Sequence, residues 1–475
     1  MTTDLGGAGP LKVTIGSLPD EVLLEIFTFY AKEAYSNEWW ILPVHVCRRW
    51  RCIVFASPLH LDLQLCVRGK GHVKEMLDSW PVLPIVIFPR ARDGRQISKV
   101  TENVIAALEH RDRVCEITLD SFPVPDRDLE RFLEMMLYPF PALKHVELWD
   151  WFDEDERAVV IPDSFLGGSA PLLQSLELTR VAFPALPKLL LSANDLVDLN
   201  LRCIAHSGYI SPEVMVASLS SMPKLQTLGL GFDSPRSRPS RESRRPPPRI
   251  RTPLPALTQL LFKGVSEYVE DFLARIDAPL LRDIDISFFN QLIFDTPQLS
   301  HIINHVERFN RPNAEVWFSH YDASVKLFAE TAGRLCLGIL CRQADWQLFS
   351  VAQICGMSLH PISTLENLTV LVMVGSDLFN PQHFGQFDIE HSQWEELLYP
   401  FTNVKNLYLA EEVGLHTVTA LQGLVGESVT QVLPALQRLL INGLQPSGPT
   451  REAAESFVAA RQRFGRPIAI HSWEE

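Results

Sequence analysis

The sequence lacks the features that mark secreted, metal-binding and membrane-spanning chains. Its eight cysteines are scattered and form no Cys-x-x-Cys pair, so neither a zinc ribbon nor a disulfide framework is predicted. No apolar run reaches the roughly 18 residues that a membrane-spanning helix needs. The first residues, MTTDLGGAGP, contain no basic segment followed by an apolar one, so no signal peptide is expected. These absences favour a cytoplasmic or nuclear protein, in which thiols stay reduced.

Motifs for bond chemistry are also missing. The sequence has no Gly-rich phosphate loop, no nucleophile elbow and no HExxH motif. His301 and His305 have the spacing of two metal ligands on a helix, but no third ligand is near them in the sequence. The acidic segment 149–158 lacks the alternating oxygen ligands and the glycine of a calcium loop. We therefore expect no catalytic, cofactor-binding or metal-binding residues, and an enzyme is the least favoured class of function.

The composition is that of a folded, acidic protein. The chain has 475 residues, of which 46% are hydrophobic and 21% are charged. These fractions are close to the globular average, and the length suggests about two or three domains. The net charge of −14 argues against general binding to nucleic acids. We expect protein partners, and neither nucleic acid nor a membrane.

Three short helices are predicted near the N-terminus. Ser17 can cap the first helix, with Pro19 in its first turn, and apolar residues recur at helical spacing over 22–30. Further apolar stretches over 39–46 and 46–56 predict the second and third helices, the last of which ends before Ser-Pro. So small a bundle cannot bury all its apolar surface. Its excess apolar side chains must face either the rest of this chain or a partner helix.

This segment resembles an F-box over about residues 15–65. The resemblance rests on LPDE at 18–21 and IF at 26–27, and on VCRRWR at 46–51 followed by Ser-Pro. The sequence departs from the F-box pattern around AKEAYSNEWW, which is longer than usual, and in having His60 or Leu61 where a Trp often stands. An F-box implies docking onto the Skp-type adaptor of a cullin-RING ubiquitin ligase. The residues that would form or support the adaptor surface are Leu18, Pro19, Ile26, Phe27, Val46, Cys47 and Trp50. The arginines at 48, 49 and 51 either form a solvated face or pair with the adaptor.

Ten segments downstream share a leucine-rich pattern. Each contains Leu-x-x-Leu-x-Leu or a close apolar variant, as in FPALKHVELWD at 140 and LPALQRLLING at 433. Each predicts one strand, with apolar side chains inward and polar ones outward, and helical stretches lie between the strands. One such unit cannot bury its apolar face, but stacked units can. The first apolar anchors of the ten segments are Val114, Leu143, Leu173, Leu196, Leu225, Leu257, Leu281, Leu368, Val404 and Leu436.

The pattern resembles the irregular leucine-rich repeats found behind F-boxes. The implied fold class is α/β: a short N-terminal three-helix F-box followed by a leucine-rich-repeat-like solenoid with a curved parallel sheet. We expect a disordered N-terminus over 1–14, the F-box-like domain over 15–65 and the solenoid over 66–475. An ordinary doubly wound sheet is the alternative. The repeat signal fades between about 300 and 360, where two strands are either antiparallel or part of the repeats.

The strand residues between the apolar anchors are expected to line the concave face of such a solenoid and to bind a protein target. Trp149 and Tyr408 can serve as aromatic anchors, although Trp149 can equally cap the core at a strand end. Acidic residues predominate in the early strands, which favours a basic target segment. The residues assigned to this face are His145, Glu147, Trp149, Glu177, Asn200, Arg202, Asp285 and Tyr408.

Together, these resemblances imply the substrate-recognition subunit of an SCF-type ubiquitin ligase. The F-box would dock the Skp-type adaptor, and through it a cullin. The solenoid would hold a target protein, whose lysines are thereby concentrated near the charged ubiquitin carrier. The alternative is a non-catalytic repeat scaffold whose F-box-like segment is structural only or acts outside a ubiquitin ligase.

An Arg- and Pro-rich segment at 233–253 interrupts the repeats. Residues 233–252 contain seven Arg and five Pro and carry a net charge of +5. This composition predicts a disordered loop inserted between two repeats. A site of serine phosphorylation, an electrostatic arm for an acidic partner and a weak nuclear import signal are further interpretations.

We expect brief trypsin treatment to cut the chain first within 233–252, because exposed, unstructured arginines are the preferred sites of cleavage. Mass spectrometry of the earliest fragments measures this directly. A first internal cut elsewhere, with this segment intact, would contradict the prediction. Deleting the segment should lower the thermal stability of the protein little.

Overall fold

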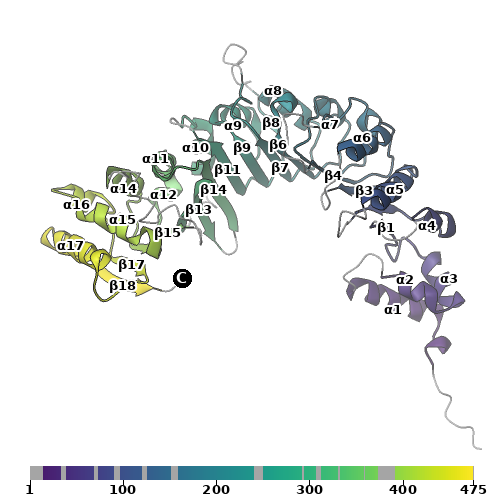
Figure 1. The fold of residues 1–475 in the computed structure, drawn as a ribbon, viewed down its shortest axis with the longest axis horizontal. Helices are drawn as coiled ribbons and strands as arrows, with labels where there is room; N and C mark the ends of the chain where they lie inside the picture. Colours follow the sequence, from purple (N-terminus) through teal and green to yellow (C-terminus); the bar gives the residue numbers. More distant parts are fainter. Residues whose placement is uncertain are drawn as a thin grey trace, which may run out of the picture. The chain divides into compact units, whose positions relative to one another are not determined.

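The computed structural model divides into two compact units. Unit 1 comprises Met1–Phe152 with Ser164–Ala170, and unit 2 comprises Asp153–Asp163 with Pro171–Glu475. The predicted domain boundary at residue 65 lies within unit 1 and stays a prediction. Figure 1 shows the helices and strands along the chain. The structure describes residues 14–33, 39–68, 73–89, 97–119, 126–150, 159–239, 250–290, 294–305, 312–329, 332–357, 359–372 and 391–473.

Unit 1 begins with a 3-10 turn (η1, Ile15–Ser17) and three helices: α1 (Asp20–Glu33), α2 (Ile41–Val46) and α3 (Arg48–Ala56). Their shared core extends beyond the helices to Leu61, Leu63 and Leu83. Trp40 lies edge-on to Trp80 at 4.6 Å between ring centroids, and its Nε1 donates to the carbonyl oxygen of Gln64 at 3.0 Å. Part of the apolar surface predicted for these helices is therefore buried against this same chain.

The rest of unit 1 consists of four parallel strands with helices between them. The strands are β1 (Leu65–Val67), β2 (Ile85–Ile87), β3 (Val114–Leu119) and β4 (His145–Trp149), paired in that order. The connecting helices are α4 (Val73–Ser79), α5 (Ile97–Leu108) and α6 (Asp126–Met135), and a 3-10 turn (η3, Phe165–Gly168) follows later in the chain. The strand pattern thus begins at residue 65, earlier than the first segment with a recognisable leucine pattern.

The first half of unit 2 repeats the same arrangement. Strands β5 (Ser175–Thr179), β6 (Asp198–Ile204), β7 (Thr227–Phe232), β9 (Gln259–Gly264) and β11 (Asp283–Phe289) are parallel neighbours. Between them lie α7 (Leu186–Leu190), η4 (His206–Gly208), α8 (Pro212–Leu219) and α9 (Ser266–Leu273). Two short strands, β8 (Thr252–Pro253) and β10 (Ile276–Asp277), form a separate parallel pair.

One strand runs antiparallel to its neighbours in the region where the leucine-rich pattern fades. The strands there are β12 (Asn313–Phe318), β13 (Asp322–Ala329) and β14 (Ala332–Leu340), and α10 (Pro297–His305) precedes them. Strand β13 is antiparallel to both its neighbours, whereas β14 is parallel to β11 and β12 is parallel to β15 (Asn367–Val372). The region thus contains three strands where two were predicted: β13 is antiparallel, whereas β12 and β14 pair in parallel with strands of the repeats.

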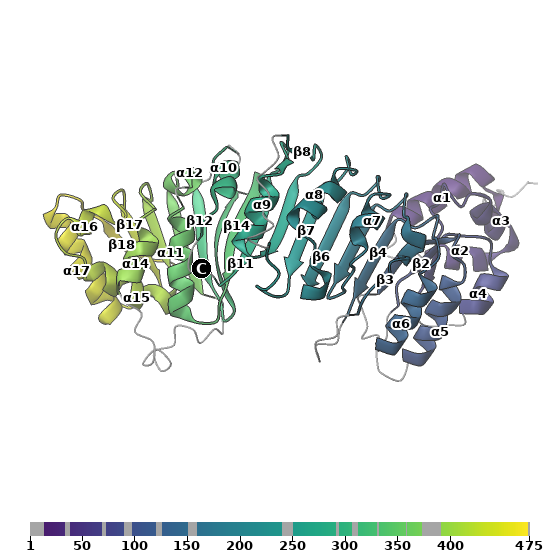
Figure 2. The same ribbon diagram turned by 90° about the horizontal axis from the view of Figure 1, so that it is seen from above.

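Parallel pairing then continues to the C-terminus through β16 (Asn406–Leu409), β17 (Arg438–Asn442) and β18 (Ala469–Trp473). In unit 2, helices cover one face of the sheet, and no helix of the described residues covers the other, here called the open face (Figure 2). The helices of this half are α11 (Ala344–Cys355), α12 (His360–Ser363), α14 (His391–Leu398), α15 (Glu411–Gln422), α16 (Ser428–Gln431) and α17 (Pro449–Arg463).

The repeated apolar anchors explain this architecture. All ten predicted anchors, from Val114 to Leu436, are 3% exposed or less. Along β11, half-buried and buried side chains alternate at every position. Burying such side chains contributes about 1.5–3 kcal/mol each. The predicted repeat architecture with a mainly parallel sheet is thus confirmed.

The ends of the Arg- and Pro-rich segment have defined structure, unlike the predicted disordered loop. Ser237 is fully buried, and its hydroxyl lies 3.4 Å from Nδ1 of His206. Thr252 belongs to β8, and Arg251 donates to Gln298 at 3.0 Å. Residues 240–249 lie outside the described residues. Ser237 is therefore a poor candidate for phosphorylation in the folded protein.

A buried arginine of α17 donates hydrogen bonds to α16 and to the turn that follows it in unit 2. Arg461 on α17 is fully buried and donates from Nη1 to the carbonyl oxygens of Val429 and Val432, at 2.9 and 3.2 Å. Its Nη2 donates to the carbonyl oxygen of Leu433 at 3.3 Å. Leu433 has a φ of 50°, in the left-handed region that a leucine rarely occupies. The guanidinium group therefore holds both the end of α16 and the turn that follows it.

We expect Arg461→Met to lower the free energy of unfolding by about 2–4 kcal/mol, because three buried carbonyl oxygens lose a charged donor. Urea denaturation followed by tryptophan fluorescence measures the change. Arg463→Met is the matched control, since Arg463 is exposed on the same helix. Equal denaturation midpoints for the two variants would contradict the structural role of Arg461.

Candidate protein-interaction surfaces

Seven apolar side chains on α1, on α2 and in the turn after α3 are exposed. Side chains on this surface range from 40% exposed at Ile26 to 93% at Leu59. Exposed apolar residues gathered on one small domain are typical of a binding surface. We refer to this set as the helical surface. Its members are Val22, Ile26, Phe29, Tyr30, Leu42, Val46 and Leu59.

The predicted adaptor contacts fall into three groups. Ile26 and Val46 lie on the helical surface, and Pro19 and Cys47 are exposed near it. Leu18 and Trp50 are half-buried. Phe27 is only 2% exposed and packs edge-on against Trp50, with 5.0 Å between the ring centroids. Phe27 can therefore support the surface from beneath but cannot contact a partner.

The prediction of adaptor contacts missed five members of the helical surface: Val22, Phe29, Tyr30, Leu42 and Leu59. They stand outside the segments that carry the F-box resemblance. The only signal in the sequence was the apolar character of these positions, and the core residues of the same helices share it.

Two of the three arginines in VCRRWR hold the helical domain together. Arg49 donates to the carboxylate of Asp20 and to the carbonyl oxygens of Gly16 and Leu18, the last at 2.5 Å. Arg51 donates to the carbonyl oxygen of Val44 at 2.9 Å. Arg49 thus fixes the segment before α1 against α3. Arg48 and Arg51 are exposed, as the interpretation of a solvated face expects, whereas pairing with the adaptor stays a prediction.

The residues predicted for the target surface do lie on outward-facing strand positions. On β4 in unit 1, His145 is exposed, and Glu147 and Trp149 are half-buried. In unit 2, Glu177 and Asn200 are direct neighbours across β5 and β6. Both units therefore present polar positions between buried leucines, as the alternating pattern predicts.

The acidic residues of the open face are paired within the chain. The Nε of Arg202 lies 3.4 Å from a carboxylate oxygen of Glu177. The Nη2 of Arg334 lies 2.6 Å from a carboxylate oxygen of Asp285, and the backbone N–H of Arg334 donates to Asp283 at 2.9 Å. Glu177 on β5 and Asp285 on β11 thus each lie beside an arginine of this chain. The preference for a basic target segment stays a prediction.

A ladder of amides crosses the later strands of the open face. Asn367 donates to the side-chain oxygen of Asn313 at 2.7 Å, and Asn406 donates to that of Asn367 at 2.5 Å. Arg438 completes the ladder by donating from Nε to the side-chain oxygen of Asn406 at 2.7 Å. The ladder joins β12, β15, β16 and β17 through their first residues. The sequence does not predict the ladder, because the asparagines are far apart in the chain and only the pairing of the strands brings them together.

Aromatic side chains accompany this ladder. Tyr408 lies edge-on to Trp473 at 5.6 Å, and Nε1 of Trp473 donates to the carbonyl oxygen of Leu409 at 3.2 Å. On β12, the Trp317 ring lies 4.7 Å from the Nζ of Lys326. Half-buried aromatic side chains beside polar groups are frequent anchors in protein interfaces. The open face over β12–β18 is therefore the second candidate surface.

The histidine pair of α10 and the buried thiol of Cys336 are the groups that bear on metal binding and thiol chemistry here. His301 and His305 face each other at 4.0 Å between ring centroids, but no group of three His, Cys, Asp or Glu in the described ranges could hold a metal ion. Burial raises the pKa of the Cys336 thiol to about 11, which keeps it protonated at neutral pH. Among the helices that the structure describes, none is both long and apolar enough to cross a membrane.

Comparisons with known proteins find matches among solved structures but not among family models or curated proteins. No protein-family model matches the sequence. A search of curated proteins also finds no match. Among solved structures, the leucine-rich repeat-containing protein LegL7 from Legionella pneumophila is 11% identical, with a TM-score of 0.26. The likeness covers 83% of this chain and 96% of LegL7. Because that TM-score is low, the description of the fold rests on the strand pairing given above.

We expect Tyr408→Ala to weaken capture of a target protein about tenfold or more, because an aromatic anchor at an interface contributes about 2 kcal/mol. Affinity capture from cells, quantified by mass spectrometry, measures the loss. Phe464→Ala is the matched control, since Phe464 is an exposed aromatic residue at the end of α17. Unchanged recovery of every captured protein with Tyr408→Ala would exclude this part of the open face as the target site.

Proposed function

We propose that this protein is the substrate-recognition subunit of an SCF-type ubiquitin ligase. In this proposal, the helical surface of unit 1 binds a Skp-type adaptor, and through it a cullin. The open face over β12–β18 in unit 2 binds a protein target. The observation that carries the proposal is the helical surface itself, which stands on the segment that resembles an F-box.

Burial of the exposed side chains of the helical surface by a partner would contribute favourably to the free energy of binding. Phe29 is 71% exposed, Leu42 67% and Val46 61%. Each apolar side chain of this size gains about 1.5–3 kcal/mol when a partner removes it from water. Arg49 and Phe27 hold the underlying helices in place, so little order has to be gained on binding. A preformed apolar surface on short helices is suited to docking against the helices of another protein.

In this role the chain acts by bringing two proteins together. The adaptor side places the complex on the cullin, and the open face retains the target. The gain in rate comes from the higher effective concentration of target lysines near the charged ubiquitin carrier. No residue of this chain then needs to make or break a bond.

A repeat scaffold that works outside a ubiquitin ligase is the second candidate. The burial of Trp40 against Trp80 favours it, since the F-box-like helices share their core with the rest of unit 1. In that case, the helical surface binds a partner other than the Skp-type adaptor. The open face keeps its role in either candidate.

The two candidates are separated by substitutions on the helical surface. We expect the full-length protein to co-purify with the Skp-type adaptor, and Val46→Asp and Ile26→Asp to reduce the recovered adaptor at least about tenfold. A buried carboxylate without a partner costs several kcal/mol at an interface. Replacing Leu18 and Pro19 together by Ala should have the same effect. Recovery is measured by quantitative immunoblotting of the purified complex.

Val82→Asp serves as the control, because Val82 is an 80% exposed residue of unit 1 outside the helical surface. It should leave adaptor recovery unchanged. If the wild-type protein recovers no adaptor, or all variants recover it equally, the ligase proposal fails and the scaffold is favoured.

A further inference from the structure

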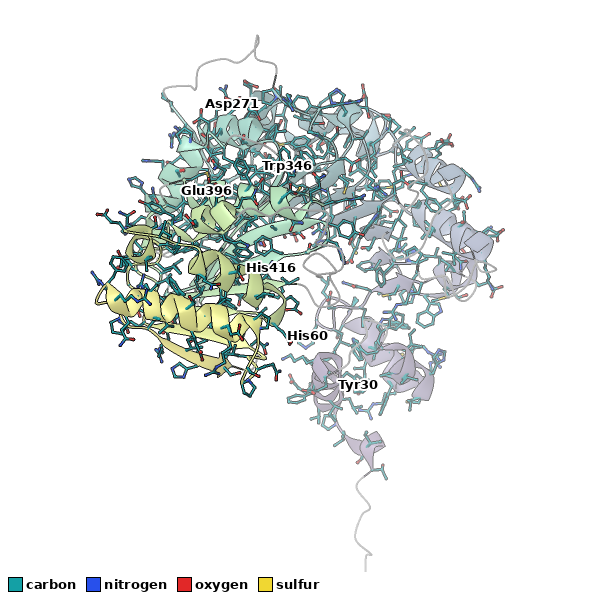
Figure 3. All side chains as sticks on the ribbon, turned by 60° about the vertical axis from the view of Figure 1, so that its left-hand side comes forward. Tyr30, His60, Asp271, Trp346, Glu396 and His416 are labelled. Atoms are coloured by element: carbon teal, nitrogen blue, oxygen red, sulfur yellow. The ribbon has the colours of Figure 1, made fainter. Side chains whose placement is uncertain are left out.

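A hollow on the helix-covered side of unit 2 lies between α11 and α14. It is lined by Asp345, Trp346 and Phe349 from α11 and by Gln393 from α14, and it has a volume of about 290 Å³. The two helices pack directly against each other. Figure 3 labels Trp346 of α11 and Glu396 of α14. The hollow is separate from both candidate surfaces described above.

Two of the residues that line this hollow each have a buried side-chain oxygen without a hydrogen-bond donor among the described residues. They are Oδ1 of Asp345 and Oε1 of Gln393. A buried polar atom without a partner is destabilising, and more so when it is charged. Both atoms are acceptors, so the group that would satisfy them is a donor. The carboxylate of Asp345 makes a positively charged donor the best match.

The walls of the hollow point to the same chemistry. Trp346 and Phe349 are half-buried, and the faces of aromatic rings attract cations. Neither α11 nor α14 contains a lysine or arginine, whereas α14 carries Glu395 and Glu396. The two helices therefore carry a net negative charge, which favours an ammonium or guanidinium group as the ligand of this hollow.

A second hollow continues along the same pair of helices. It has a volume of about 430 Å³, and Gln353, Met357 and Tyr399 are among its lining residues. Trp346 and Gln353 are two helical turns apart, which corresponds to about 10 Å. An extended peptide spans that distance in about three residues. Two adjoining hollows at this spacing favour a chain segment over a free small cation.

We propose that the face formed by α11 and α14 docks a basic segment of a partner protein. A lysine or arginine side chain of that segment enters the first hollow, where Asp345 and Gln393 accept its hydrogen bonds and Trp346 and Phe349 flank it. An apolar side chain about three residues away enters the second hollow, against Met357 and Tyr399. Charge complementarity selects this partner, and the proposal does not depend on a role in ubiquitin ligation.

The test uses the peptide fluorescein-Ala-Arg-Ala-Ala-Leu-Ala-NH₂, labelled on its N-terminal amine, titrated with the full-length protein at physiological salt and followed by fluorescence anisotropy. A second peptide carries citrulline, which keeps the shape of arginine without its charge. We expect the citrulline peptide to bind about tenfold more weakly or worse, because the charged hydrogen bonds are lost. Equal affinities for the two peptides would overturn the proposal.

Variants locate the binding site. Asp345→Asn should weaken binding of the arginine peptide about tenfold, and Trp346→Leu should also weaken it. The control is Asp163→Asn, the same change at an exposed aspartate of unit 2, which should leave affinity unchanged. Circular dichroism melting curves establish that each variant is folded. Equal losses for Asp345→Asn and Asp163→Asn would mean general attraction to an acidic protein, and the proposed site would fail.

Two further experiments test which ligand binds in the hollow. If N-acetyl-arginine amide competes as well as the peptide does, the hollow is a small-cation site and segment docking is refuted. The chain's own basic segment is tested by replacing Arg241, Arg244, Arg245 and Arg249 with Ser. If this change raises peptide affinity severalfold, the occupant is that segment, from the same or a second copy, and the partner assignment is overturned.

Discussion

The structure depends on one constraint: no single strand of this chain can bury its own apolar side chains. Each repeat offers a few leucines on one side of a short strand, and these leave water only when another repeat lies on either side. The anchors from Val114 to Leu436 are almost completely buried for this reason. The polar groups discussed above, including the asparagine ladder, occupy positions that this apolar packing holds in register. Stability and binding surfaces are therefore set by the same stacking of neighbours.

Much of the fold could be read from the sequence, because the repeat pattern is local. Each leucine-rich segment carries its own strand signal, and all ten such segments form strands in the structure. The reversal at β13 was open, because parallel and antiparallel strands have the same alternation of side chains. The position of β14 beside β11 depends on hydrogen bonds between residues some fifty positions apart. Nothing in either segment encodes that choice on its own.

The candidate surfaces were less predictable than the fold. Val46 and Phe27 are both apolar residues of the F-box-like segment, yet one is exposed and the other is buried beneath Trp50. From the sequence, the acidic residues Glu177 and Asp285 favour a basic target, but in the structure each lies beside an arginine of this chain. Those pairs join neighbouring strands, and the partner of Asp285 is distant in the sequence. Sequence patterns thus indicate which positions face outward, whereas the groups left available there depend on register.

The single antiparallel strand has a consequence for how unit 2 is assembled during synthesis. Strand β12 leaves the ribosome before β13 and β14, but its place in the sheet lies beyond both of them. Strand β11 therefore has no partner on its free edge until β14 has been synthesised. Strand β12 joins the sheet through its antiparallel pairing with β13. Addition of strands in chain order, which serves every other repeat in unit 2, stops at this point. The hairpin divides the unit into two folding segments, and the second, from β15 onward, can build on β12 only after that hairpin has closed.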